Sequence, residues 1–370
     1  MKKYKKTISF ILIILIVIAL CISLFKKHSN ESSKNEAGIN IVPTMEDNIS
    51  DDSLWCGTFQ LVWNEMKNEF VKGDILFLND KNNSMVKKLN EELFNKNMIS
   101  DDHYYIKSGE MNLKLKEEIE KGIKEKFNQE SDVLNGLNWQ KELPENEKEK
   151  IINYFFYTML YREFKFREEF DNLEKGKFAN KYNDVEYFGI DKENGDATGK
   201  AIDVLYYNSK NDFAIKIATD TNDEVIFCKN PKGKTFKEIY EDIINKAERY
   251  EGTGRITDSD EFKAPKLSFN EKREYTELAN KEFETINPEG KGIINKAIQT
   301  IKFDIDEKGG KIKSEAFIDM KLAVPTSYGE EPKEKPRYFY LDNTFALFLK
   351  EEEKDIPYFA AKISDVSKFK

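Results

Sequence analysis

Apolar positions recur with helix-like spacing through the first half of the chain. This period predicts helices over residues 54–70, 85–93 and 113–127, and the polar residues 51–53 can cap the first of them. The third helix would bury one apolar stripe, formed by Leu115, Ile119 and Ile123. Residues 151–170 are apolar and aromatic, which indicates a buried strand followed by a helical turn.

The second half of the chain changes to short apolar or alternating runs. These predict strands over residues 213–217, 224–228, 264–269, 297–305, 339–349 and 358–363. Helices are predicted over residues 275–283 and 236–247, the latter with Ile239, Ile243 and Ile244 facing inward. Helices first and strands later predict an α+β fold with large, mostly antiparallel sheets and a cluster of helices from the N-terminal half.

The longest alternation in the chain begins at Gly310. Its inward face would consist of Gly310, Ile312, Ser314, Ala316, Ile318, Met320 and Leu322. Period two over this length exceeds the usual strand of about five or six residues. A polar stretch containing Pro325, Pro332 and Pro336 follows, and it does not fit a sheet interior. The simplest interpretation is a half-buried strand followed by a surface loop.

An uncharged apolar run, residues 8–25, lies near the N-terminus between four preceding lysines and two following ones. Its length suits a membrane-spanning helix, and the lysine excess places the N-terminus inside the cell. A lipoprotein interpretation through Cys21 is disfavoured because Leu20 precedes it, where a small residue is expected. We therefore expect an uncleaved anchor over residues 1–27 and an extracellular remainder, with cleavage or lipidation as alternatives.

Residues 28–52 are polar and show no apolar period, so we expect a flexible acidic stalk there. The remaining residues, 53–370, contain no Pro/Gly linker or internal repeat, and we expect one domain and a monomer. The chain carries a net charge of −9. Because the anchor end is basic, the extracellular part is acidic, which argues against a nucleic-acid partner and against membrane contact beyond the anchor.

Catalytic and metal chemistry find little support in the composition. The chain has two histidines, and the one beyond the N-terminal segment, His103, follows two aspartates at what we interpret as a turn or helix start. No phosphate-binding glycine loop is present. We expect no enzyme activity, no metal and no cofactor. Cys56 and Cys228 either pair outside the cell or are two buried small apolar residues, and the second is the simpler interpretation.

Five segments, in order along the chain, resemble the serpin family. They read TMLYREFKFREEF (158–170), DEVIFCKNPKGKTFKEIYEDI (223–243), APKLSFNEKREYTELANKEF (264–283), NKAIQTIKFDIDEKGGK (295–311) and YLDNTFALFLKEEEKDIPYFAAKISDV (340–366). The first resembles the family's Asn-Ala-x-Tyr-Phe-Lys-Gly-x-Trp segment. The second is similar to a strand, turn and helix of the family, and the third to its Pro-Lys strand and the helix after it. The fourth is similar to the strand that leads into the proximal hinge, and the fifth to the terminal strand pair. Each match is weak by itself, but the common order is hard to obtain by chance.

Several positions depart from the family's pattern. Thr158 stands for an Asn, Phe166 for a Trp, Thr344 for a Pro and Ala361 for a Gly. The resemblance is weaker before residue 155, where the family's early helices look shortened. Its Ser-Pro-Leu-Ser segment has at best a stand-in at residues 75–80, which lacks both that Ser and that Pro.

The resemblance implies a mechanism. In inhibitory serpins a protease cleaves an exposed loop, and the loop then inserts into the central sheet with the protease attached. The implied hinge is Glu307, Lys308, Gly309 and Gly310, and the inserting face is the uncharged set above, from Ile312 to Leu322. By family spacing, the scissile bond lies among Lys321, Leu322, Ala323 and Val324. Ile312 is bulkier than the residue the family prefers, which would slow or stall insertion.

Two functions remain open from the sequence. The loop around 309–336 inserts on cleavage, which makes the protein an inhibitor of an extracellular serine or cysteine endopeptidase. Alternatively, the segment is already a sheet strand or never inserts, which leaves a non-inhibitory binding or structural protein at the cell surface.

Overall fold

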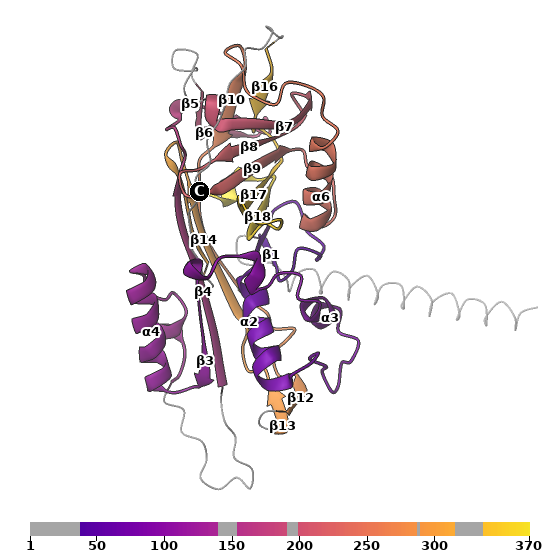
Figure 1. Cartoon of the computed structure of the whole chain (residues 1–370), viewed down its shortest axis with the longest axis vertical. Helices are drawn as coiled ribbons and strands as arrows, with labels where there is room; N and C mark the ends of the chain where they lie inside the picture. The colour runs from indigo at the N-terminus through magenta and orange to yellow at the C-terminus, as the bar shows by residue number, and fades with distance from the viewer. Residues whose placement is uncertain (1–37, 140–153, 191–198, 287–288, 315–335) are drawn as a thin grey trace, which may run out of the picture.

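The computed structural model describes residues 38–139, 154–190, 199–286, 289–314 and 336–370. Within these residues, helices from the N-terminal half lie beside large, mostly antiparallel sheets, which confirms the α+β class (Figure 1). The α-helices described are α2 (Thr58–Met66), α3 (Ser84–Asn90), α4 (Leu113–Phe127) and α6 (Phe236–Ala247). A π-helix, Lys67–Val71, continues α2 directly.

The seven-stranded sheet forms the centre of the main hydrophobic core. Its order is β1 (Asn40–Val42), β2 (Ser53–Cys56), β18 (Phe359–Ile363), β17 (Phe345–Glu351), β9 (Asp223–Lys229), β8 (Asp212–Ala218) and β7 (Ile202–Ser209). Every residue of β9 and β17 is buried. All neighbours in this sheet are antiparallel except β1 and β2, which are parallel.

The five-stranded sheet carries the segment with the long alternation. Its order is β11 (Leu267–Glu274), β14 (Ile298–Ile305), β15 (Gly309–Ser314), β4 (Tyr154–Lys165) and β3 (Tyr104–Glu110). All its ladders are antiparallel. α4 packs on β3 and β4, and α2 packs on β4.

Two smaller sheets complete the described structure. The four-stranded sheet has the order β16 (Tyr338–Tyr340), β10 (Glu261–Pro265), β6 (Tyr182–Gly189) and β5 (Asp171–Phe178). β12 (Glu282–Ile286) and β13 (Glu289–Ile293) pair as a separate hairpin.

The expected stalk is wrong for residues 38–52. Ile39 and Ile41 are fully buried in the main core, and β1 pairs with β2. Asp52, predicted as a stalk residue, accepts hydrogen bonds from the backbone N–H groups of Ser364 and Asp365 at 2.8 and 2.9 Å. A stretch of few apolar residues forms a strand here because a parallel neighbour and the C-terminal segment cover it. The ordered domain therefore includes residues from 38 onward.

Several predicted elements are corrected by the structure. Residues 53–56 form β2, so the first helix begins only at Thr58. Residues 275–283 are not a helix, because the chain turns over 276–280 and then enters β12. The predicted strands 264–269 and 339–349 each divide into two strands that belong to different sheets. The helical turn expected after the strand of 151–170 is absent from the described residues 154–170.

Other predictions are confirmed. α4 spans the predicted residues, and its stripe of Leu115, Ile119 and Ile123 is buried. α6 also matches its prediction, with Thr235 as N-cap residue, although Ile244 is 37% exposed rather than inward.

Cys56 and Cys228 are both free and buried, which corrects the disulfide alternative. They lie on β2 and β9, and two strands separate these in the sheet. That order places them at least about 14 Å apart, because neighbouring strands are about 4.8 Å apart, whereas a disulfide needs Cα atoms within about 7 Å.

Within the described ranges, no helix is both long and apolar enough to cross a membrane. The apolar run 8–25 lies outside those ranges.

Candidate functional site

The hinge residues form a tight turn between β14 and β15. Ile305 pairs with Gly310, so the chain reverses over Asp306–Lys308. The Asp306 N–H donates to the Gly309 carbonyl at 2.9 Å, and the Asp306 carboxylate accepts from the Lys308 N–H at 2.9 Å. The hinge is therefore a closed β-hairpin turn.

Both glycines of the hinge are required by close backbone approach. Gly309 has φ +149°, and a Cβ placed there would lie 2.2 Å from the Phe164 carbonyl oxygen. A Cβ on Gly310 would lie 2.5 Å from the Phe164 ring. Glycine lets β15 approach β4 this closely because it lacks a side chain.

Glu307 attaches the turn to its surroundings. Its carboxylate accepts a hydrogen bond from Lys266 Nζ at 2.5 Å, and its carbonyl accepts from the Phe170 N–H at 2.9 Å. Burial opposes the charged carboxylate, but the hydrogen bonds from Lys266, Asn172 and the backbone, together with the charge of Lys266, outweigh it, and the pKa of Glu307 is lowered. The side chain of Lys308 points into solvent, with 65% of it exposed.

β15 lies between β14 and β4 in the middle of the five-stranded sheet. Ile312 pairs with Phe303 on one side and with Arg162 on the other. Ile312 and Ser314 are fully buried on the inward face, as the alternation requires. The bulk of Ile312 is accommodated, because this side chain is part of the main hydrophobic core.

The outward residues of β15 are covered as well. Lys311 lies over the Tyr161 ring, with Nζ 5.6 Å from its centroid. Lys313 Nζ donates to the Glu130 carbonyl and to the Asp132 carboxylate, both at 2.7 Å. Although Lys313 lies on the outward face of β15, it is consequently only 8% exposed.

Ser314 ends the described strand in a buried polar network. Its hydroxyl donates to the Thr300 carbonyl at 3.0 Å and lies 3.2 Å from the Thr58 hydroxyl on α2. Gln299 Nε2 donates to that Thr58 hydroxyl at 2.7 Å, and the Tyr275 hydroxyl donates to Gln299 Oε1 at 2.7 Å. The network fixes Ser314 between α2 and β14.

The remaining predicted site residues cannot be placed. The scissile-bond candidates and the rest of the inserting face lie outside the described residues, namely Ala316, Ile318, Met320, Lys321, Leu322, Ala323 and Val324.

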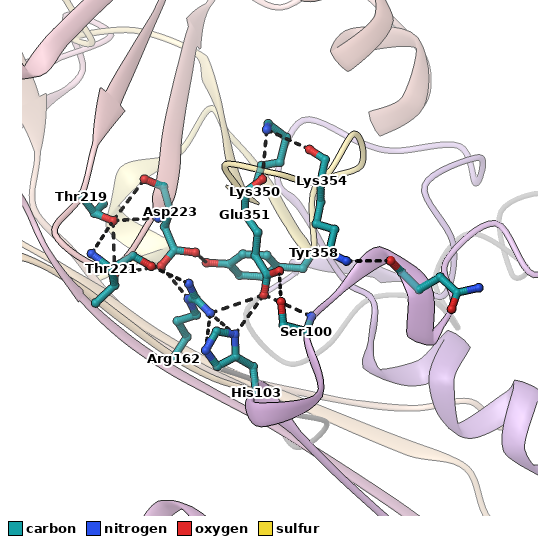
Figure 2. Close-up of polar contacts among 11 residues, drawn as sticks. Ser100, His103, Arg162, Thr219, Thr221, Asp223, Lys350, Glu351, Lys354 and Tyr358 are labelled. Atoms are coloured by element: carbon teal, nitrogen blue, oxygen red, sulfur yellow. Dashed lines mark hydrogen bonds and ion pairs between the residues drawn. The ribbon is translucent and has the colours of Figure 1, made fainter. Parts of the chain in front are cut away.

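A buried ionic cluster that the sequence did not indicate lies beside β15 (Figure 2). Its centre is Arg162 of β4, which is 3% exposed. Arg162 Nε donates to the Asp223 carboxylate at 2.5 Å, and Nη2 donates to the Thr221 carbonyl at 3.0 Å. Arg162 Nη1 lies 3.4 Å from Glu351 Oε1 and contacts the His103 ring. One guanidinium thus joins the five-stranded sheet to β9 and β17 of the seven-stranded sheet.

The carboxylates of this cluster have further partners. Asp223 accepts hydrogen bonds from the hydroxyl groups of Tyr358 and Thr221, each at 3.0 Å. Glu351 accepts one from the Ser100 hydroxyl at 2.7 Å, and its other oxygen lies 2.9 Å from His103 Nδ1. Asp223 and Glu351 are direct neighbours in the ladder between β9 and β17. Two buried acidic groups therefore face one arginine.

His103 is the last residue of a single 3₁₀ turn, Asp101–His103, that leads directly into β3, so of the two predicted alternatives the turn is confirmed. The ring is fully buried. Burial first, and then the charges of Arg162 and Lys126, lower the pKa of His103 below its usual range. The imidazole is neutral and serves as a partner of Arg162 inside the cluster.

Neither cysteine of the described residues has the low pKa of a reactive thiol. The thiols of Cys56 and Cys228 are buried, and burial raises the pKa of each. Across the described ranges, no group of three or more His, Cys, Asp or Glu side chains is placed to hold a metal ion.

Comparisons with known proteins give structural neighbours only. No protein-family model matches the chain, and no curated protein matches its sequence. Among solved structures, the complex of thyroxine-binding globulin with thyroxine is 15% identical with a TM-score of 0.41, over 68% of this chain and 65% of that chain. The chain therefore spans less than two thirds of that globulin.

Two further neighbours are serpins by name. Serpin48 of the insect Tenebrio molitor is 11% identical with a TM-score of 0.42, over 85% of this chain and 92% of that chain. A cleaved Serpin 42Da is 10% identical with a TM-score of 0.43, over 71% of this chain and 76% of that chain.

Proposed function

We propose that this protein is a serpin-like inhibitor of an extracellular serine or cysteine endopeptidase. The target protease would cleave the loop around 309–336 at a bond among Lys321–Val324, and the freed strand would then insert into the five-stranded sheet. The N-terminal helix would hold the protein in the cell membrane with the domain outside. The proposal rests on the ordered serpin-like segments of the sequence and on the position of β15.

The observation that carries the proposal is that β4 and β14 both extend beyond Ser314, so that a continuation of β15 would lie between them, in a position called the slot below. β15 ends at Ser314, which pairs with Leu160 of β4 and Ile301 of β14. Both neighbouring strands extend beyond these pairs, because β4 begins at Tyr154 and β14 begins at Ile298.

The register of β15 indicates which residues the slot would receive. Extending the two ladders by two residues sets position 316 opposite Thr158 of β4 and Gln299 of β14. The inward positions that follow Ser314 in the alternation are Ala316, Ile318 and Met320, and none is charged. Uncharged residues suit a slot that faces α2 and the core, because an unpaired buried charge there would be costly.

A non-inhibitory role is the second candidate, and particular contacts favour it. Lys313 and Ser314 already have side-chain partners on the surrounding elements, and the hinge turn is closed. A strand held in this way behaves as a permanent part of the sheet. The protein would then present the loop for binding without a mechanical step.

Cleavage combined with melting separates the two candidates. The intact protein is treated with trypsin-like, elastase-like and papain-like proteases, and products are analysed by denaturing electrophoresis and thermal melting. Inhibition predicts a complex that survives the denaturant with at least one protease, together with a higher melting temperature of the cleaved protein. Cleavage between Lys321 and Lys335 with no complex and no change in melting would exclude insertion.

A pair of loop variants provides the matched control. Ile318→Arg places a charge on the inserting face, whereas Phe317→Arg places the same charge on the opposite face. Insertion predicts that only Ile318→Arg abolishes the complex and the rise in melting temperature. Equal behaviour of the two variants would show that this face never enters the sheet.

A further inference from the structure

Ile312 of β15 and Arg162 of β4 are direct cross-strand partners. Directly opposed residues of antiparallel strands point to the same face, with Cβ atoms about 5 Å apart. Ile312 is fully buried, and Arg162 is 3% exposed. β15 therefore covers one side of the Arg162 cluster and shields it from water.

The opposite side of the cluster belongs to the seven-stranded sheet. Asp223 begins β9 and Glu351 ends β17, and both carboxylates turn toward Arg162 (Figure 2). The cluster thus has β15 on one side and the joint between the two large sheets on the other. Ser100, His103 and Tyr358 complete its hydrogen bonds.

These contacts make the two sides of the cluster depend on each other. If β15 left the sheet, water would reach Arg162 and weaken its ion pairs with Asp223 and Glu351, because the local dielectric would rise. If Arg162 lost its charge, two buried carboxylates would face each other uncompensated, which strongly disfavours the closed joint. The closed joint and the seated strand therefore stabilise each other.

We propose that Arg162 couples the presence of β15 in the sheet to the joint between the five-stranded and seven-stranded sheets, so that the strand cannot leave without loosening the joint. The coupling involves described residues alone and does not depend on whether the loop inhibits a protease. It gives the molecule a means to transmit the state of the hinge strand across its core.

Amide hydrogen exchange on the intact, uncleaved protein tests the coupling without any protease. The test variant is Arg162→Met. The matched control is Arg337→Met, because Arg337 is likewise a buried arginine paired with an aspartate, Asp260 at 2.8 Å, but it directly precedes β16 of the four-stranded sheet. The coupling predicts that Arg162→Met speeds exchange at residues 310–314 by about tenfold or more, as expected for contacting groups.

The comparison of the two variants decides the outcome. Exchange in α6 should stay at the wild-type rate in Arg162→Met, and exchange at 310–314 should stay at the wild-type rate in Arg337→Met. Wild-type exchange at 310–314 in Arg162→Met, or equal acceleration by both arginine variants, would overturn the proposal.

A second arm works in the reverse direction and covers the case in which Arg162→Met does not fold. Ile312→Ser replaces the apolar side chain that covers the Arg162 cluster by a small polar one and leaves Arg162 unchanged. The control is Ile301→Ser, which alters another fully buried isoleucine, on β14, that is not paired with Arg162. His103 is the reporter, because the chain has only two histidines and its ring signals are readily assigned.

The ring signals of His103 are followed by NMR from about pH 8 to about pH 5, the range in which an ordinary histidine titrates. The wild-type protein and Ile301→Ser should show no titration, because burial and the nearby cations lower the pKa of His103. Ile312→Ser should make His103 titrate. If Ile312→Ser leaves the signals fixed, or if Ile301→Ser moves them equally, the coupling is wrong.

Discussion

Ile312 offers a direct measurement of whether the hinge strand is seated in the sheet. Its side chain is fully buried against the main core between β14 and β4. Replacing a buried isoleucine by alanine removes three carbon atoms from the core and leaves a cavity, which costs about 2–5 kcal/mol. The well-packed position of Ile312 on a central strand supports a cost of about 3 kcal/mol for Ile312→Ala.

The assay is equilibrium unfolding of the uncleaved protein in urea, monitored by tryptophan fluorescence. Lys311→Ala is the matched control on the same strand, because its side chain faces outward over Tyr161. Removing that contact should cost about 1 kcal/mol or less. A loss below about 1 kcal/mol for Ile312→Ala would refute the reasoning, since a strand outside the sheet would leave this side chain in water.

Other properties of the described structure give three further expectations. Gly309→Ala should lower the free energy of unfolding by about 1–3 kcal/mol, because φ is positive and the new Cβ meets the Phe164 carbonyl; urea unfolding beside wild type checks this, and equal stability would contradict it. Because the pKa of His103 is lowered in the folded state, below about pH 6.5 the unfolded chain binds a proton there that the folded chain does not bind. The contribution of His103 to the free energy of unfolding is therefore full above that pH and falls by about 1.4 kcal/mol at pH 5.5. His103→Gln should remove this part of the pH dependence, and the same pH profile of the urea midpoint in His103→Gln and wild type would count against it. Cys56 and Cys228 should react with a thiol reagent only when the protein is unfolded, and both should react although no reductant is added. Failure of either to react in the unfolded protein would reveal a disulfide.

The sequence predicts best where one local pattern decides the structure. α4 is found with its bounds because a clear apolar stripe is framed by Asn112, which caps its first turn, and Asn128 in a left-handed conformation. The alternation from Gly310 likewise predicts which side chains of β15 face inward. In both cases the side chains that determine the element are neighbours in the sequence.

Partners distant in the sequence account for the errors. Residues 275–283 have a helix-like pattern, but the backbone N–H groups of Tyr275 and Asn280 donate to the carbonyls of Ala297 and Ile294, and Phe283 bridges to Phe77. The Arg162 cluster could not be predicted, because Asp223 and Glu351 lie 61 and 189 positions away along the chain. Its local sign was the place of Arg162 on the same face of β4 as the buried Leu160 and Phe164.

β1 also determines how far the domain could travel from a membrane. The described structure begins at Gly38, so the proposed membrane anchor, if it ended at residue 25, would leave residues 26–37 as the tether. However those residues are arranged, they span at most about 40 Å, because an extended chain advances about 3.5 Å per residue. A domain on so short a tether would meet proteases bound to the same membrane at a high effective concentration and would rarely meet free ones. Selectivity would then come partly from location, before any loop residue is read by a protease.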